Sequence, residues 1–210
     1  MMPDKDISAP IHAIARLRPG TDGDGISTLV TFYGCPLRCK YCLNARTLGA
    51  IPQGCQMTPE EVYERVRIDD LYFRVTGGGV TFGGGEPCLQ SEFIRRFADL
   101  NRHSWKIRVE SSLNVPAENV RALMPIVDQW IVDVKSWNAF TYLAYTGRDN
   151  TNVKGNLAMF ALEDMQDKVL IRLPLITSFN DEDDRQNSMG YLREMGFSNF
   201  DLFTYKTPKQ

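Results

Sequence analysis

The sequence of 210 residues contains only two histidines, which leaves little material for histidine-based metal sites or catalytic triads. No apolar run approaches the roughly 20 residues of a membrane helix, and no apolar stretch follows the first charges as in a secretory signal. The 24 basic residues do not exceed the 26 acidic ones. We therefore expect a cytoplasmic protein that binds neither membrane nor nucleic acid, with residues 1–210 forming a single domain.

Five cysteines stand out in this ordinary composition, because Cys35, Cys39 and Cys42 lie within eight residues. The odd total and the lack of a signal argue against structural disulfides. Close thiolates on a short loop typically hold a soft metal. Zinc would need a fourth ligand, whereas an iron–sulfur cluster held by three thiolates leaves one iron open. A zinc site and three packed thiols stay as alternatives. Cys55 and Cys88 lack a cysteine neighbour at ligand spacing and are interpreted as ordinary reduced thiols.

Short β-branched and aromatic runs alternate with helical patterns along the chain. The predicted strands are residues 26–33, 80–82, 106–110, 129–134, 168–173 and 199–204. The predicted helices are a helix capped by Thr58 that ends near Arg67, one containing Phe93, Ile94, Phe97 and Leu100, and residues 117–124, 153–163 and 181–195. Six strands separated by helices predict parallel βα units in one sheet.

Polar residues and glycines gather where these strands end, which is the ligand-binding edge of a parallel sheet. They are residues 35–42, residues 83–86, Glu110, Ser111, Asp133, Lys135, Arg172, Tyr205 and Lys206. An iron with an open site can bind a ligand that carries an amine and a carboxylate, and a low-potential cluster can pass it one electron.

We expect each of these groups to meet one part of such a ligand. The glycines would let a main chain approach it, and Glu86 would accept from its ammonium group. Lys135 or Arg172 would pair with its carboxylate. The alternatives are a tight strand-to-helix turn for the glycines, a surface ion pair between Asp133 and Lys135, and a salt bridge at the rim for Arg172.

The motifs together resemble those of the radical S-adenosylmethionine (SAM) superfamily. Cys-x3-Cys-x2-Cys, with Tyr41 before the third cysteine, is followed by Gly84-Gly85-Glu86. The chain is most similar to the activating enzymes of glycyl radical enzymes, as in pyruvate formate-lyase activating enzyme. The similar stretches run in order from about residue 22 to 206 and are Asp22-Gly23-Asp24-Gly25, FYGCPLRCKYCLN, GGGVTFGGGEPCLQSEFI, VDVK, LIRLPLI and Thr204-Tyr205-Lys206.

The resemblance implies an α/β fold, a partial (β/α)6 barrel, and one role for each matching residue. Cys35, Cys39 and Cys42 would be the catalytic ligands of a [4Fe-4S] cluster whose open iron chelates S-adenosyl-L-methionine. The cofactor-binding residues would be Tyr41 at the adenine, Gly84, Gly85 and Glu86 at the methionyl ammonium, and Asp133, Lys135 and Arg172 at the ribose and carboxylate. Ser111 and Lys206 stand at two further family positions, where threonine and histidine are common, and Leu43 replaces another common histidine.

The activity implied is reductive cleavage of SAM to methionine and a 5′-deoxyadenosyl radical, which abstracts hydrogen from a glycine of a partner glycyl radical enzyme. Such an enzyme needs an electron donor such as flavodoxin or ferredoxin. Arg16 and Arg18 could meet such an acidic donor, or belong to a solvated face. Two other functions stay open: a radical SAM enzyme that modifies a peptide or small metabolite directly, and an electron-transfer or metal-binding iron–sulfur module.

Overall fold

The computed structural model describes residues 7–102 and 104–205. Its strands are β1 (Ala9–Pro19), β2 (Ile26–Phe32), β3 (Gln56–Met57), β4 (Gly79–Gly84), β5 (Lys106–Ser111), β6 (Gln129–Asp133), β7 (Val169–Leu175) and β8 (Phe200–Thr204). Its α-helices are α1 (Pro59–Val66), α2 (Asp70–Thr76), α3 (Ser91–Asn101), α4 (Ala117–Leu123), α5 (Ala139–Thr146), α6 (Thr151–Leu162) and α7 (Glu182–Glu194). Four short 3-10 helices cover Ala45–Leu48, Arg67–Asp69, Pro87–Gln90 and Gln166–Lys168.

The described strands form one sheet in the order β3-β1-β2-β4-β5-β6-β7-β8. From β2 onward all neighbours are parallel, which confirms the six parallel strands expected from the sequence. The sheet is not closed, since β8 lies at one edge and β3 and β1 at the other. The fold is therefore the open, partial barrel that was predicted.

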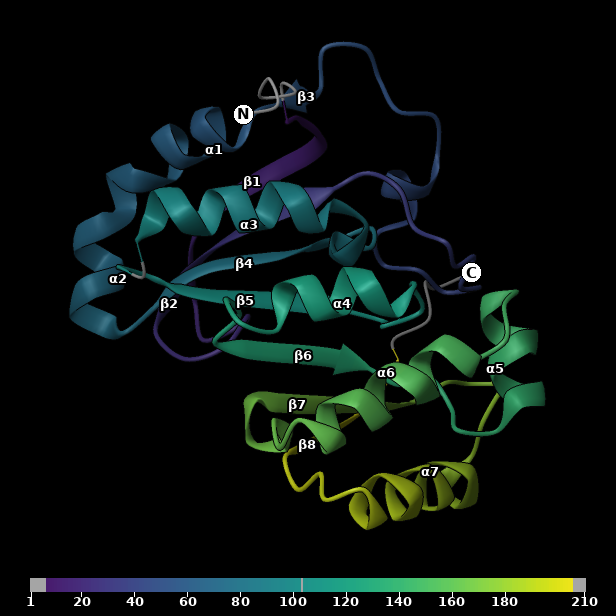
Figure 1. Cartoon of the computed structure of the whole chain (residues 1–210). Helices are drawn as coiled ribbons and strands as arrows, with labels where there is room; N and C mark the ends of the chain where they lie inside the picture. Colours follow the sequence, from purple (N-terminus) through teal and green to yellow (C-terminus); the bar gives the residue numbers. More distant parts are fainter. Residues whose placement is uncertain (1–6, 103, 206–210) are drawn as a thin grey trace.

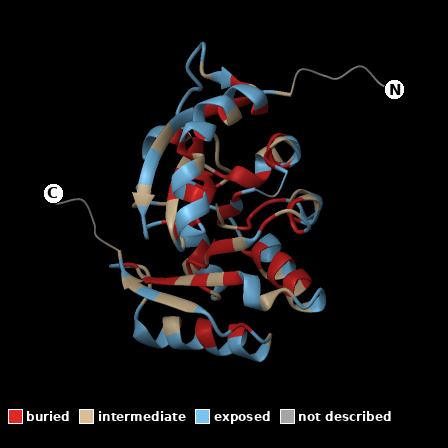
Figure 2. Ribbon diagram, turned by 90° about the vertical axis from the view of Figure 1, so that its left-hand side faces the viewer, coloured by how far each residue is buried: buried red, intermediate tan, exposed pale blue. Residues whose placement is uncertain are grey.

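Helices cover the outer face of the sheet, where α1, α3, α4 and α6 contact one another in series (Figure 1). Thr58 begins α1 with the expected capping box, because its hydroxyl accepts from Glu61 N and the Glu61 carboxylate accepts from Thr58 N. On α3 the predicted apolar stripe is buried, and Phe97 packs edge-on against Phe82 of β4 at 5.2 Å between ring centroids. Figure 2 shows the buried residues gathered in the interior of the molecule and the exposed residues on its outside.

Four elements were not predicted: β1, β3, α2 and α5. β1 runs antiparallel to β2, and its end residues Ala9 and Pro10 pair with β3. It adds an edge strand before the first parallel one, so the parallel core begins at the second strand of the chain. Among the residues that the structure describes, no helix combines the length and apolarity needed to cross a membrane.

Candidate active site

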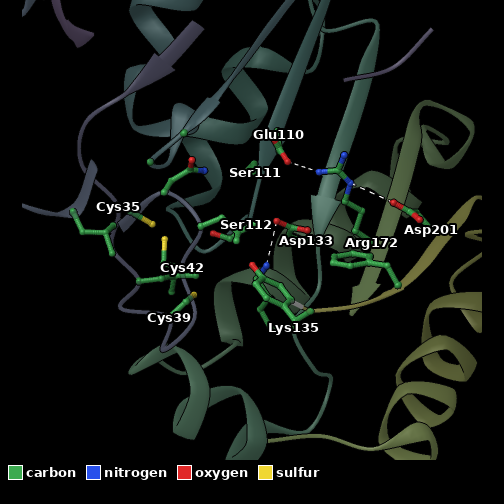
Figure 3. A pocket seen from close by; sticks show the side chains of 18 residues that line it. Cys35, Cys39, Cys42, Glu110, Ser111, Ser112, Asp133, Lys135, Arg172 and Asp201 are labelled. Atoms are coloured by element: carbon green, nitrogen blue, oxygen red, sulfur yellow. Dashed lines mark hydrogen bonds and ion pairs between the residues drawn. The ribbon is translucent and has the colours of Figure 1, made fainter. Parts of the chain in front are cut away.

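A cavity of about 330 Å³ lies at the carboxyl ends of the parallel strands, within the range of small-molecule sites. Its lining residues are Cys35, Leu37, Cys39, Cys42, Leu43, Asn44, Leu48, Gly84, Gly85, Glu110, Ser111, Ser112, Asp133, Lys135, Arg172, Asp201, Phe203 and Tyr205. Figure 3 shows the three cysteines on one side of this space and the charged side chains on the other. Each motif predicted to meet at this rim therefore contributes at least one residue to the cavity, while Lys206 lies outside the described residues.

The cysteine loop begins where β2 ends, and three hydrogen bonds fix its path. Gly34 has a φ of 90°, a left-handed conformation that glycine adopts without strain. Gly34 N donates to Thr47 O at 2.9 Å, and Glu86 N donates to Gly34 O at 2.8 Å. Farther along, Arg38 N donates to Thr146 O at 2.8 Å, which attaches the loop to the end of α5. The loop is thus tied to β4 on one side and to α5 on the other.

The glycine turn after β4 lies so close to this loop that side chains are excluded. A Cβ on Gly85 would stand 2.2 Å from Gly34 O, and one on Gly84 would stand 2.6 Å from Thr31 Cβ. Gly84 also has a φ of 91°. Close backbone approach therefore accounts for the two glycines in this structure, and both residues line the cavity.

Glu86 follows the glycines but is 1% exposed and is not among the lining residues. Its carboxylate accepts from the hydroxyls of Ser111 and Ser112, each at 2.7 Å. It also accepts from Ser112 N at 3.0 Å and from Cys88 N at 3.2 Å. These bonds join the glycine turn to the end of β5. Contact between Glu86 and a ligand ammonium stays a prediction.

The opposite wall of the cavity carries alternating charges from three neighbouring strands. Sheet register places Arg172 of β7 between Asp133 of β6 and Asp201 of β8. Arg172 forms an ion pair with Glu110, and its Nε lies 3.5 Å from the Asp201 carboxylate. Lys135 Nζ lies 3.2 Å from the Asp133 carboxylate. The wall can therefore present both cations and carboxylates to a zwitterionic ligand.

Burial and neighbouring charges alter the pKa values of these groups. Burial, followed by the Glu86 charge, raises the pKa of the Cys35 thiol to about 12, and burial raises that of Cys39 to about 11. Burial of Lys135 acts to lower its pKa, but Asp133 and Tyr205 outweigh it, so the net pKa is raised. Burial, followed by the Asp133 charge, raises the pKa of Glu110 although Arg172 opposes it.

The three thiols that line the cavity are a donor set that fits an iron–sulfur cluster. Within residues 7–102 and 104–205, no three His, Cys, Asp or Glu side chains gather closely enough to hold one ion. Tetrahedral zinc would require sulfurs about 4 Å apart, given Zn–S bonds of about 2.3 Å. A cubane needs wider spacing, because each thiolate binds a different iron. Half-buried cysteines on one wall of one cavity fit such a group, and their thiols must lose protons to bind it.

Three other residues considered from the sequence, Tyr41, Cys55 and Cys88, are not among the residues that line the cavity. Tyr41 packs against Tyr145 and Phe179, with ring centroids 6.1 Å and 5.8 Å away. Lys206 lies outside the described residues. Cys88 is fully buried, and its thiol donates to the Ser111 hydroxyl at 3.4 Å. Cys55 is partly exposed and lines a separate groove beside β1. The packed role expected of Cys88 agrees with its burial.

Sequence reasoning did not assign a ligand role to Ser112, Asp201 or Phe203, which also line the cavity. Asp201 and Phe203 of β8 and Tyr205, directly after it, follow one another at intervals of two residues, and all three line the cavity. Side chains of a strand alternate between its two faces, so this period of two was the available signal. Ser112 carried no such signal, because it lies beyond the end of β5.

The fold and the site together define the class of protein. Residues 29–199 match the model of the radical SAM superfamily, and the chain belongs to this superfamily. The superfamily uses a [4Fe-4S] cluster and SAM, and its three-cysteine motif is present here. The solved structure of Streptococcus suis SuiB bound to S-adenosylmethionine superposes with a TM-score of 0.66 at 13% identity, over 86% of this chain and 41% of SuiB, which shows the shared fold.

Similar curated proteins are activating enzymes. The (2S)-3-sulfopropanediol dehydratase activating enzyme of Klebsiella oxytoca is 36% identical over 130 residues, which cover 61% of this chain and 40% of that enzyme. The pyruvate formate-lyase-activating enzyme of Staphylococcus aureus (strain USA300) is 31% identical over 189 residues, covering 86% of this chain and 73% of that enzyme. The chain thus spans less than half of one relative and about three quarters of the other.

Proposed function

We propose that this chain is a radical SAM enzyme that activates a partner glycyl radical enzyme by removing hydrogen from the α-carbon of a glycine. The observation that carries the proposal is one cavity that gathers Cys35, Cys39, Cys42, Lys135 and Arg172 in a chain similar to two such activating enzymes. When bound, the [4Fe-4S] cluster supplies one electron to SAM, whose C5′–S bond breaks to give methionine and a 5′-deoxyadenosyl radical.

The protein's own contribution is to bind and orient. The three thiolates would hold the cluster, and Gly84 and Gly85 would let backbone atoms meet the methionyl ammonium. Lys135 would pair with the methionyl carboxylate, while Asp133 would accept from the ribose hydroxyls. Arg172 carries Glu110 and Asp201 on either side, so it would fix this wall. Tyr41 would lie by the adenine, and Ser111 and Lys206 complete the cofactor-binding set. An acidic carrier such as flavodoxin or ferredoxin would supply the electron.

The test uses pyruvate formate-lyase and (2S)-3-sulfopropanediol dehydratase as substrates, because these are the enzymes that the relatives' names specify. The reconstituted protein, SAM and dithionite are mixed with each one without oxygen, and the electron paramagnetic resonance spectrum is recorded. We expect a glycine-centred doublet on at least one substrate and none with the Cys39→Ala variant. Rapid SAM cleavage without a doublet on either would favour direct modification of a peptide or small molecule.

A further inference from the structure

The segment that contains the cysteine loop carries basic residues and no acidic ones. Residues 25–59 contain Arg38, Lys40 and Arg46 but no aspartate or glutamate. The chain has a formal net charge of −2, of which this segment contributes +3, so the remainder contributes −5. All three cations are exposed; Arg38 and Lys40 lie between the cysteines of the motif, and Arg46 follows Cys42 by four residues. Positive charge is therefore gathered on the segment that would hold the cluster.

A fourth cation contacts this segment from the turn that follows α5. Arg148, which follows α5, donates from Nε to Pro36 O at 3.3 Å. Arg38 donates from Nη1 to Cys35 O at 2.6 Å and to Leu37 O at 2.8 Å. The backbone bond from Lys40 N to Tyr145 O, at 3.1 Å, brings the two segments together. Two guanidinium groups are thus fixed against the carbonyls of the cysteine loop.

Within the described residues these four cations form no ion pair, although Asp149 directly follows Arg148 in the sequence and interacts with its charge. Throughout the part of the chain that the structure describes, Arg38, Lys40, Arg46 and Arg148 take part in no ion pair, whereas eight other arginines do. Two of those eight are Arg16, paired with Asp69, and Arg18, paired with Asp22. The two arginines considered from the sequence as contacts for an acidic donor are therefore already neutralised.

Exposed apolar side chains accompany the cations. Leu43, next to Cys42, is 76% exposed, and Leu143 of α5 is 50% exposed. Interfaces of transient complexes combine an apolar centre with a polar rim, and arginine is enriched in them. We define the basic face by Arg38, Lys40, Leu43, Arg46, Leu143 and Arg148.

We propose that the basic face is the docking surface for an acidic one-electron carrier protein, such as reduced flavodoxin. This inference rests on the proposed function, which requires one electron for each SAM cleaved. Within the carrier, the anionic flavin hydroquinone becomes the neutral semiquinone without proton transfer, and the electron enters at the three-cysteine site. Charge complementarity selects an acidic partner and speeds its encounter with the face. Arg38 and Lys40 are the sequence neighbours of Cys39, so a carrier bound at this face would lie beside the cysteine motif.

The test compares two charge-reversal variants of the reconstituted enzyme. Lys40→Glu/Arg46→Glu changes two cations of the basic face, for which the structure shows no side-chain hydrogen bond within the described residues. Arg95→Glu/Lys106→Glu makes the same change in charge on α3 and at the start of β5, both exposed and outside the cysteine loop. Iron content is measured first, so that both proteins are compared with equal cluster loading.

Two readouts separate docking from catalysis. Binding of oxidised flavodoxin is measured by calorimetry, and reduction of the enzyme by flavodoxin hydroquinone is followed by stopped-flow absorbance. For Lys40→Glu/Arg46→Glu we expect association slowed by at least about tenfold at low ionic strength, with a smaller difference at high salt. The control should match the unmodified enzyme. With dithionite as reductant, both variants should cleave SAM at the unmodified rate.

Two results would count against the docking proposal, and a third would count against the proposed function alone. Equal flavodoxin binding and reduction in all proteins would overturn it. Normal reduction by flavodoxin together with lost activation of the partner enzyme under dithionite would assign the face to the substrate protein instead. Failure of every protein to cleave SAM with dithionite would remove the proposed function, while the calorimetric comparison would still decide whether flavodoxin binds this face.

Discussion

Lys135 Nζ lies 3.2 Å from the carboxylate of Asp133, two residues earlier at the end of β6. The same ammonium group stands over the ring of Tyr205, 5.2 Å from its centroid. Lys135 is only 6% exposed, so this cation is fixed in the cavity wall by a carboxylate and an aromatic ring. A buried cation in a set position is well suited to orient the carboxylate of a small ligand.

Replacing Lys135 tests whether it binds SAM. We expect Lys135→Ala to weaken SAM binding by about tenfold or more, since a charge-assisted hydrogen bond contributes about 1.5–3 kcal/mol. Iron content should stay at about four per chain, because the thiolates hold the cluster. Equilibrium binding to the reconstituted protein measures the first quantity, and iron analysis the second. Unchanged SAM affinity would refute the assignment.

Glu86 is expected to stabilise the protein even without ligand. Its buried carboxylate accepts four hydrogen bonds from Ser111, Ser112 and Cys88, and removing it leaves buried donors unpaired. Glu86→Ala should lower the free energy of unfolding of the cluster-free protein by about 3 kcal/mol or more, and Ser112→Ala by about 1–2 kcal/mol. Chemical denaturation provides both values. If Glu86 acted only on the ligand ammonium, Glu86→Ala would leave the free energy of unfolding of the cluster-free protein unchanged.

Two glycine substitutions should act in opposite directions. Gly85→Ala would place a Cβ 2.2 Å from Gly34 O, so the cysteine loop or the glycine turn must move. We expect it to prevent cluster loading and to destabilise the protein. Gly155→Ala, inside α6 with nothing within 4 Å of the new Cβ, should stabilise it by up to about 1 kcal/mol. Thermal unfolding and iron analysis of the two variants provide the comparison. Equal effects of the two substitutions on thermal stability and iron content would contradict the close approach of Gly85 to Gly34 O.

The raised thiol pKa values predict how the cluster-free protein responds to alkali. The pKa of Cys35 is about 12 in the folded chain against an ordinary 9.0, so folding disfavours its thiolate. This stabilising contribution is complete below about pH 9 and declines as pH rises toward 12. We therefore expect the free energy of unfolding to fall above pH 9, and to fall less steeply in Cys35→Ser. If the free energy of unfolding falls equally steeply with pH in both proteins, the Cys35 thiol is not protected from ionisation by burial.

Much of the fold followed from the sequence because the parallel strands are buried and regularly spaced. β1 was missed because only its first part is buried and its pairing with β2 is interrupted by register shifts, with Leu17 at a φ of 53°. An exposed, bulged edge strand shows no clear period of two. α5 was missed because its own apolar side chains are spread around the helix and form no stripe with a helical period. In the fold, α5 is attached to the cysteine loop by the hydrogen bond from Arg38 N to Thr146 O.

The site was predictable where the chemistry of a residue is unusual, and less so where neighbours determine its role. Cys35, Cys39 and Cys42 were identified by spacing, and the structure places all three on one cavity wall. Glu86 shows the limit, since its bonds with Ser111 and Ser112 depend on how β4 and β5 end. Asp201 is brought to the cavity by the register of β8 with β7, which sequence spacing alone does not specify.

The proposed function requires that this cavity support reductive cleavage of SAM. The most direct measurement is the yield of 5′-deoxyadenosine when the reconstituted protein is incubated without oxygen with SAM and dithionite, quantified by chromatography with mass detection. We expect 5′-deoxyadenosine and methionine in equal amounts, dependent on dithionite and absent with Cys39→Ala. No 5′-deoxyadenosine above the Cys39→Ala level, from protein fully loaded with iron, would contradict it.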